Sequence, residues 1–383
     1  MTACSSPSPS ARLGLPLQAA LVAAQFLALG LLMGSWATGL PGLAARFGYS
    51  AQELSGVLLA VAAGSVLAFL SCARLMQAVG QRTFIRATGP LAAYAMVTTL
   101  LVADSLPLAV IAFVFGWSGA AFDVAINGSA VTLERLHGRS LMSKLHAMFS
   151  SGGVLAAGAT AGIAWSGLHP LWLAVPVALL MTVLALYTPV LPALGPEGGH
   201  AAGAAPLRVR PWRLGFAALL CLLCEGTMYD WSSVYMAQVW QTPLFLSVAG
   251  FGMFSAAMAA GRFGGDALRD RFGAPLLLFG GCTVAALGAL LCVWGGTREL
   301  ALAGFVLVGL GLSNVIPIVF ALAPARHAQA PERAIAFVSG TGFIGFLIGP
   351  PLIGLWTELA SFESSLLLVC AAALGTALLA GRR

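Results

Sequence analysis

Twelve long apolar stretches constrain the fold of this chain more than any other feature of its sequence. An α-helix rises 1.5 Å per residue, so about 20 apolar residues cross the ~30 Å hydrocarbon core of a bilayer. The stretches reach that length, and six lie on each side of a basic, Gly- and Pro-rich connector at residues 192–212. We therefore expect twelve transmembrane helices, at roughly residues 15–40, 53–73, 84–103, 107–132, 145–167, 169–191, 213–238, 244–266, 275–295, 300–322, 335–357 and 363–380.

Composition supports this interpretation. Of the 383 residues, 59% are hydrophobic and 8% are charged, which leaves too little polar surface to cover a water-facing globule. The sequence therefore predicts an all-α membrane protein with the lipid bilayer as its solvent. The net charge of +6 would suggest an anionic partner for a soluble protein, but here the position of each basic residue matters more, and we expect no nucleic-acid partner.

Basic residues are distributed very unevenly between the two sides of the predicted spans. All 19 Lys and Arg residues except Arg46 and Arg298 fall at or beside one side. By the positive-inside rule that side is cytoplasmic, and an even number of spans places both termini there. We expect a multi-pass protein of the cell (inner) membrane. The first span follows only Arg12 and lacks a small-residue cleavage site, so we expect it to be retained.

The chain divides into two halves of similar design. The segment FVFGWSG at 113–119 is matched by FVLVGLG at 305–311, and each is followed by an Asn deeper in the span, Asn127 and Asn314. Such weak internal symmetry is typical of transporters built from two six-helix units. We expect a short cytoplasmic tail at 1–14, an N-terminal six-helix bundle at 15–191, a cytoplasmic linker at 192–212, and a C-terminal six-helix bundle at 213–383.

Specific motifs resemble those of a known family. The segment GRFGGDALRDRFG at 261–273, in a chain of six plus six spans, is similar to the cytoplasmic loop motif of the major facilitator superfamily. The segments GAAFDVAIN at 119–127 and HAMFSSGG at 146–153 resemble the fucose-permease-like branch of bacterial inner-membrane permeases. The resemblance implies the major facilitator fold, with two pseudo-symmetric six-helix bundles, and transport of a small organic solute such as a sugar.

Ionisable groups inside spans are candidates for proton coupling, because each costs several kcal/mol in lipid unless it is paired, wetted or neutral. Desolvation favours the neutral form of a carboxylic acid, which lets it gain and lose protons as access alternates. The family resemblance implies that Asp123 binds proton or substrate. The family's other carboxylate, expected in span one before Pro41, has no counterpart. The candidates are Asp123, Glu225, Asp230 and His146.

Three of these candidates also have a purely structural alternative. Asp123 would then form a helix-packing hydrogen bond, Asp230 would cap or pack near the outer side, and His146 would be a packing residue at a helix end. Glu225 is the preferred second proton site, since span seven is the symmetry mate of span one. Glu225 and Asp230 are five residues apart, hence about 140° apart around a helix, so both cannot point into one cavity.

Further polar and aromatic residues are candidates for gating and for solute binding. Arg262 and Asp266 are spaced i, i+4 and could form an ion pair that closes the cytoplasmic side. The resemblance supports a gating role for this segment, which also carries Asp270 and Arg271. Tryptophans could stack on a ring of the solute or could anchor span ends at the interface, while amides could hydrogen-bond hydroxyls. The substrate-binding candidates are Asn127, Asn314, Trp36, Trp117, Trp231 and Gln25.

Other functional classes find little support in the sequence. Cys221 and Cys224 form one CxxC without a second pair, so we expect no metal site and no cofactor. No P-loop, HExxH or GxSxG motif is visible in the sequence, so we expect neither an ATP-driven pump nor an enzyme. The leading prediction is a monomeric, proton-coupled secondary transporter of a small organic solute. The alternatives are proton-coupled efflux of amphipathic compounds and a non-transporting membrane sensor that keeps the fold.

Overall fold

The computed structural model describes residues 15–138, 141–189, 191, 211–327 and 330–381, and every regular element within them is a helix. The expected tail at 1–14 and all but the last two residues of the expected linker at 192–212 lie outside the described residues.

The N-terminal half contributes one continuous helix to each of its six spans. Long apolar stretches explain this regularity, since in lipid every backbone polar group must be satisfied within the helix. The helices are α1 (Leu15–Phe47), α2 (Ala51–Val79), α3 (Gln81–Thr99), α4 (Ser105–His137), α5 (Met142–Trp165) and α6 (Leu171–Leu186).

The C-terminal half also has six spans, and three of them consist of two helices each, α8 with α9, α11 with α12, and α14 with α15. The helices are α7 (Trp212–Gln238), α8 (Leu244–Ser247), α9 (Ala249–Phe263), α10 (Gly265–Trp294), α11 (Arg298–Leu312), α12 (Val315–Arg326), α13 (Pro331–Leu359), α14 (Phe362–Ser365) and α15 (Leu367–Gly381).

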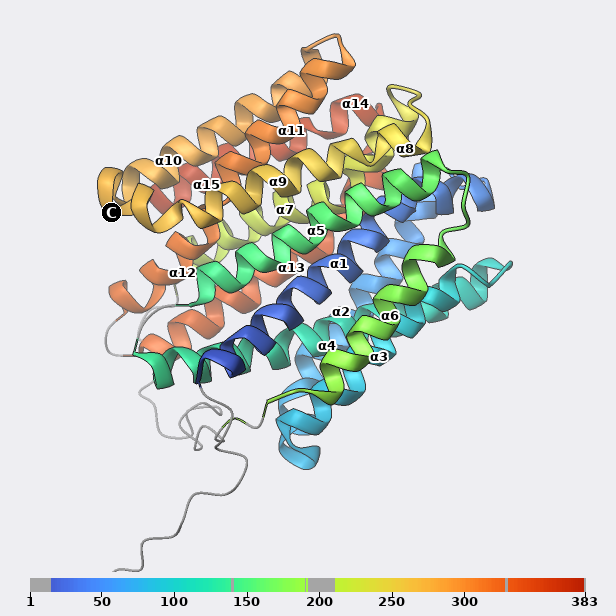
Figure 1. The fold of residues 1–383 in the computed structure, drawn as a ribbon. Coiled ribbons are helices and arrows are strands. Elements are labelled where there is room, and N and C mark those ends of the chain that lie inside the picture. Colours follow the sequence, from blue (N-terminus) through green and yellow to red (C-terminus); the bar gives the residue numbers. More distant parts are fainter. Residues whose placement is uncertain (1–14, 139–140, 190, 192–210, 328–329, 382–383) are drawn as a thin grey trace, which may run out of the picture.

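The twelve-span prediction is confirmed. Within the described residues, ten helices or helix pairs are long and apolar enough by themselves to cross a membrane. The remaining two are α3, which carries Arg82 and Arg86 in its first two turns, and α6, which has only 16 residues. The chain is therefore an all-α membrane protein with twelve transmembrane helices in two pseudo-symmetric bundles, which lie side by side in Figure 1. We call the end where α1 and α7 begin the linker end, and the opposite end the far end.

The two halves use equivalent close helix contacts. In the first half α1 packs along α5, and in the second half α7 packs along α13. A Cβ atom added at Gly152 of α5 would overlap the carbonyl oxygen of Leu27, and one added at Gly345 of α13 would overlap that of Leu219. Small residues permit this approach of helix backbones in membranes, so the internal duplication extends to the packing.

The most extensive contacts between the halves run along α5 with α9 and α2 with α13, and α1 with α7 and α5 with α8 add smaller ones. Trp165 on α5 meets Phe245 on α8 edge to face, with ring centroids 5.0 Å apart. On the other side, Phe69 of α2 lies 4.4 Å from Phe343 of α13, again between ring centroids. These contacts position the polar residues at the centre of the molecule.

The segment after Phe263 differs from the loop expected there. Gly264 has φ −86° and ψ −4°, close to helical values, and the chain continues as a helix. The helical course breaks at Gly273, with φ 75° and ψ 157°, a backbone conformation that glycine adopts without a steric penalty. The turn in the chain is therefore at Gly273, and Arg262 lies well before it.

Candidate functional site

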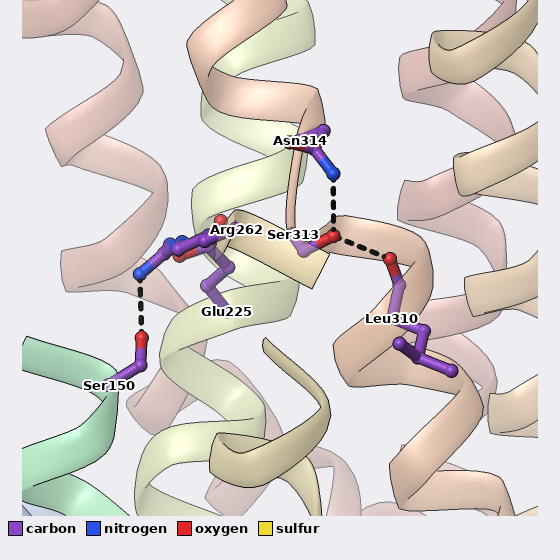
Figure 2. Close-up of polar contacts among 6 residues, drawn as sticks. All are labelled: Ser150, Glu225, Arg262, Leu310, Ser313 and Asn314. Atoms are coloured by element: carbon purple, nitrogen blue, oxygen red, sulfur yellow. Dashed lines mark hydrogen bonds and ion pairs between the residues drawn. The ribbon is translucent and has the colours of Figure 1, made fainter. Parts of the chain in front are cut away.

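A polar cluster forms where α5 of the first half meets α7 and α9 of the second. Figure 2 shows Arg262 of α9 between Glu225 of α7 and Ser150 of α5. The Nη2 atom of Arg262 lies 3.3 Å from Oε2 of Glu225, and its Nη1 donates to Oγ of Ser150 at 3.0 Å. The side chains of Arg262 and Glu225 are only 12% and 14% exposed. One guanidinium thus contacts both halves at a place with little access to water.

The helix that carries Arg262 is held in place from the break between α11 and α12. The Nδ2 atom of Asn314 donates to the carbonyl oxygen of Gly261 and to Oγ of Ser313, each at 3.0 Å. The hydroxyl of Ser313 in turn donates to the carbonyl oxygen of Leu310 at 2.7 Å (Figure 2). Since Gly261 directly precedes Arg262, these hydrogen bonds fix the backbone of α9 beside the cluster.

Aromatic residues flank the cluster on its far-end side. Tyr229, one turn after Glu225, lies nearly parallel to Phe149 of α5 with ring centroids 6.2 Å apart. It also meets Phe251 of α9 edge to face at 4.8 Å. Among the described residues, the hydroxyl of Tyr229 and the Oε1 atom of Glu225 are buried and have no hydrogen-bond partner. Buried polar atoms without partners are costly, so both atoms are candidates for a hydrogen bond to a polar solute.

Tyr229 is not among the site residues predicted from the sequence. The sequence pattern that indicates this residue is its i, i+4 spacing from Glu225, which places both side chains on one face of α7.

Asp123 lies apart from this cluster, in α4. The Nδ2 atom of Asn127 donates to Oδ1 and to the backbone oxygen of Asp123, both at 2.9 Å. Near the end of the same helix, Glu134 accepts hydrogen bonds through Oε1 from the backbone N–H groups of Leu141 and Met142 at 2.7 and 2.8 Å. Glu134 thus secures the start of α5, while Asp123 and Asn127 form a local pair within the first half.

Asp230 and His146 are both half-buried near the cluster. Asp230 follows Glu225 by five residues and therefore leaves α7 in a different direction, as its spacing predicts. His146 lies one turn before Ser150 on α5, and its ring meets Phe26 of α1 edge to face at 5.4 Å.

Three further substrate-binding candidates also have partners within their own half. The amide of Gln25 donates to Oγ1 of Thr188 at 3.0 Å and so joins α1 to the end of α6. The indole N–H of Trp117 donates to Ser71 of α2 at 3.3 Å. Trp231 is fully buried and meets Phe362 of α14 edge to face at 5.4 Å between ring centroids.

Trp36 lines a cavity of about 370 Å³ at the far end of the first half. Its ring packs on Phe115, with centroids 4.9 Å apart. The hydroxyls of Thr38 and Thr160 meet in the wall at 2.9 Å. Further lining residues come from α3, from the start of α6 and from Leu244 of the second half.

The gate candidates occupy two different places. Asp270 and Arg271 are exposed at the linker end, where the guanidinium of Arg271 lies 5.2 Å from the centre of the Phe272 ring. Arg262 pairs with Glu225, a different partner from the predicted Asp266, whose side chain lies outside the described part of the structure.

Cys221 and Cys224 of α7 lie near Cys282 of α10. Cys221 and Cys224 are buried free thiols. Among the described residues, no three His, Cys, Asp or Glu side chains are grouped so that they could hold a metal ion.

Comparison with known proteins places this architecture in a family. The sequence profile of the Major Facilitator Superfamily matches residues 21–331. An uncharacterized MFS-type transporter of Yersinia pestis is 32% identical over 342 residues, 88% of each chain. The crystal structure of the nucleoside transporter NupG (a mutant) has a TM-score of 0.70 at 14% identity, covering 95% of this chain and 98% of that one. A variant of the E. coli fucose:proton symporter FucP has a TM-score of 0.66 at 16% identity, covering 96% and 98%. The chain therefore belongs to the Major Facilitator Superfamily and is a membrane transporter.

Proposed function

We propose that the protein is a proton-coupled secondary transporter of a small polar organic solute, with its central site between the two halves. The observation that carries this proposal is the contact of Arg262 with both Glu225 and Ser150, since it sets an ionisable carboxyl at the boundary between the bundles. The similarity to a fucose:proton symporter supports the choice of coupling ion.

The proposed cycle uses Glu225 and Asp123 as proton sites, one in each half. Burial favours the neutral form of a carboxylic acid, while an adjacent guanidinium favours the ionised form. Glu225 has both influences, because it is 14% exposed and 3.3 Å from Arg262. Asp123 accepts a hydrogen bond from Asn127. Alternate exposure of these carboxyls to the two sides of the membrane would let them load and release protons.

The solute would bind where aromatic rings and unpaired polar atoms meet. The ring of Tyr229 with Phe149 and Phe251 offers an apolar surface, and the Tyr229 hydroxyl is available for hydrogen bonding. Stacking on the apolar face of a ring while bonding its polar edge suits a sugar or a nucleoside. Both solute classes occur in the names of transporters with this fold.

The same proposal gives the orientation of the protein in the membrane and the two bundles that move. The linker end would face the cytoplasm of a cell with an inner membrane, because Arg74, Arg135 and Arg269 are exposed there. Both termini would then be cytoplasmic. The bundles at 15–191 and 213–383 would rock as two bodies within a monomer.

The test is the external pH of lightly buffered, right-side-out vesicles after addition of single sugars and nucleosides. A transported solute should make the exterior alkaline, and Glu225→Gln should abolish that signal. The exposed Glu358→Gln, at the far end, is the matched control and should behave like the parent. Uptake of radiolabelled solute without any proton movement would contradict proton coupling.

Efflux of amphipathic compounds is a second candidate, and the far-end cavity favours it. The walls of this cavity are largely apolar, with Trp36 among them. Accumulation of a fluorescent amphipathic dye in inverted vesicles energised with a proton gradient would support efflux. Saturable sugar or nucleoside uptake with no dye transport would exclude it.

A further inference from the structure

Arg262 is the one side chain of the polar cluster that contacts an acid of its own half and a hydroxyl of the other half. We infer that Arg262 is a positioning residue that links the proton on Glu225 to the contact between the two bundles. The Arg262–Ser150 contact holds while Glu225 is ionised and is released when Glu225 gains a proton. The inference rests on the role of Glu225 in the proposed function.

Charge balance shows which protonation state of Glu225 favours the Arg262–Ser150 contact. A guanidinium stays protonated under all physiological conditions. With Glu225 ionised, Arg262 has a counter-charge at 3.3 Å in a place where both side chains are less than one-sixth exposed. With Glu225 protonated, its partners in the cluster are neutral groups such as the Ser150 hydroxyl, and a poorly hydrated charge without a counter-charge is unfavourable. The arrangement seen here is therefore stabilised by the ionised form of Glu225.

Linkage then fixes the effect of pH on the two bundles. The state with the Arg262–Ser150 contact binds fewer protons than a state in which Glu225 is neutral. A fall in pH favours whichever state binds more protons. Acidification should therefore release the contact, and alkaline conditions should favour it.

The packing of α5 against α9 shows which end would open. Towards the far end these helices meet through small residues: a Cβ added at Gly153 would lie 3.2 Å from Phe251, and one at Gly252 would lie 3.1 Å from Ala157. The Arg262–Ser150 hydrogen bond lies closer to the linker end than these contacts. Its release would let the linker ends separate while the far-end packing serves as the pivot.

Other titratable groups lie near Arg262 and Glu225, and the experiment must separate their effect on the pH response from that of Glu225. His146 on α5 interacts electrostatically with Arg262, Cys221 on α7 with Glu225 and Arg262, and Tyr229 on α7 with Arg262. Asp230 also lies on α7, and Asp266 follows Arg262 along the chain. Histidine is the residue type whose ordinary titration falls near neutral pH, so His146→Gln is a required control.

The experiment measures distances between spin labels at the linker end of the two halves, in nanodiscs without solute. Labels at Leu136→Cys and Phe272→Cys suit this purpose, because both positions are exposed. The six described native cysteines are buried, and Cys4, outside the described residues, is replaced by Ser. The parent should change from a shorter to a longer distance between about pH 8 and about pH 5.5.

Three variants and two controls decide the outcome. Glu225→Gln should show the long distance at every pH, and Ser150→Ala should lose most of the pH response, which Ser150→Thr should restore. Ser151→Ala is the matched control, because its hydroxyl bonds only the Ala147 carbonyl of its own helix, at 2.9 Å. This control and His146→Gln should keep the response of the parent. The inference would be overturned by a Ser150→Ala variant whose label distance changes with pH as in the parent. It would also be overturned by a His146→Gln variant whose label distance does not change with pH.

The result is separable from the proposed function. A distance that follows pH through Glu225 and Ser150 supports the link even when no tested solute is transported. Conversely, solute-driven alkalinisation that depends on Glu225, together with distances indifferent to pH, would uphold the transporter and reject the link.

Discussion

Single side chains carry the chemistry of this molecule, and the Arg262–Glu225 pair can be tested by its stability. Arg262→Gln leaves the Glu225 carboxylate poorly exposed and without its counter-charge. Breaking a buried pair on one side costs about 3–5 kcal/mol, and we expect about 3 because both groups keep some exposure. Thermal unfolding in detergent should show the loss, and Arg262→Gln with Glu225→Gln should recover part of it. A double variant no more stable than Arg262→Gln alone would mean that the pair is not coupled.

The second prediction at this level concerns Asp123. Asp123→Asn keeps a side chain that can bond Asn127 but cannot ionise, so it should abolish proton-driven uptake without changing the unfolding temperature. Asp104→Asn is the control, because Asp104 is exposed before α4 and makes no side-chain capping bond. Uptake that is unchanged in Asp123→Asn would remove this residue from the coupling scheme.

The sequence identified the carboxyl of Glu225 as a candidate but not the partner of Arg262. Ionisable side chains inside spans are rare because each one raises the free energy of the protein in lipid, and this identified Glu225 as a candidate. The partners of Arg262 lie 37 and 112 positions away in the chain, and only folding brings them together. From spacing alone, the i, i+4 neighbour Asp266 was the one partner that could be proposed.

Helices and their contacts were predictable to the extent that length and apolarity determine them. Each of the twelve apolar stretches became a span, because lipid permits no other backbone arrangement for them. The break at Asn314 and the helix at 265–272 were not predicted, since both depend on packing between spans. Asn314 at the break bonds the Gly261 carbonyl of a neighbouring helix, a partner that no local pattern reveals.

The close packing of α13 on α7 gives a test of an element pair. Gly345→Ala adds a Cβ where the backbone oxygen of Leu219 lies, whereas Gly340 on the same helix has open space around it. Overpacking costs about 1–3 kcal/mol, so Gly345→Ala should lower the unfolding temperature and Gly340→Ala should not. Equal effects of the two substitutions would mean that helix propensity, not close contact, controls stability here.

The turn at Gly273 gives a second test. Gly273 has φ 75° and ψ 157°, a backbone region that is essentially confined to glycine and costs other residues about 1–3 kcal/mol. Gly273→Ala should therefore destabilise the protein by roughly that amount, measured by thermal unfolding. Gly280→Ala, further along α10 with nothing near its added Cβ, should be neutral or slightly stabilising.

The whole molecule can transport by rocking only if the far ends of its halves separate during the cycle. At the far end, a Cβ added at Gly354 of α13 would lie 2.6 Å from the Cβ of Ser55 on α2, within reach of a disulfide after a small adjustment. Oxidised Ser55→Cys with Gly354→Cys should stop solute uptake, and a reductant should restore it, while each single variant should tolerate oxidation. Full uptake by protein shown to be cross-linked would mean that the halves do not part at this end, and that the solute enters by another route. Loss of uptake that the reductant reverses would instead establish that α2 and α13 separate in each cycle. The far-end packing would then be a second gate, opposite the Arg262 contact.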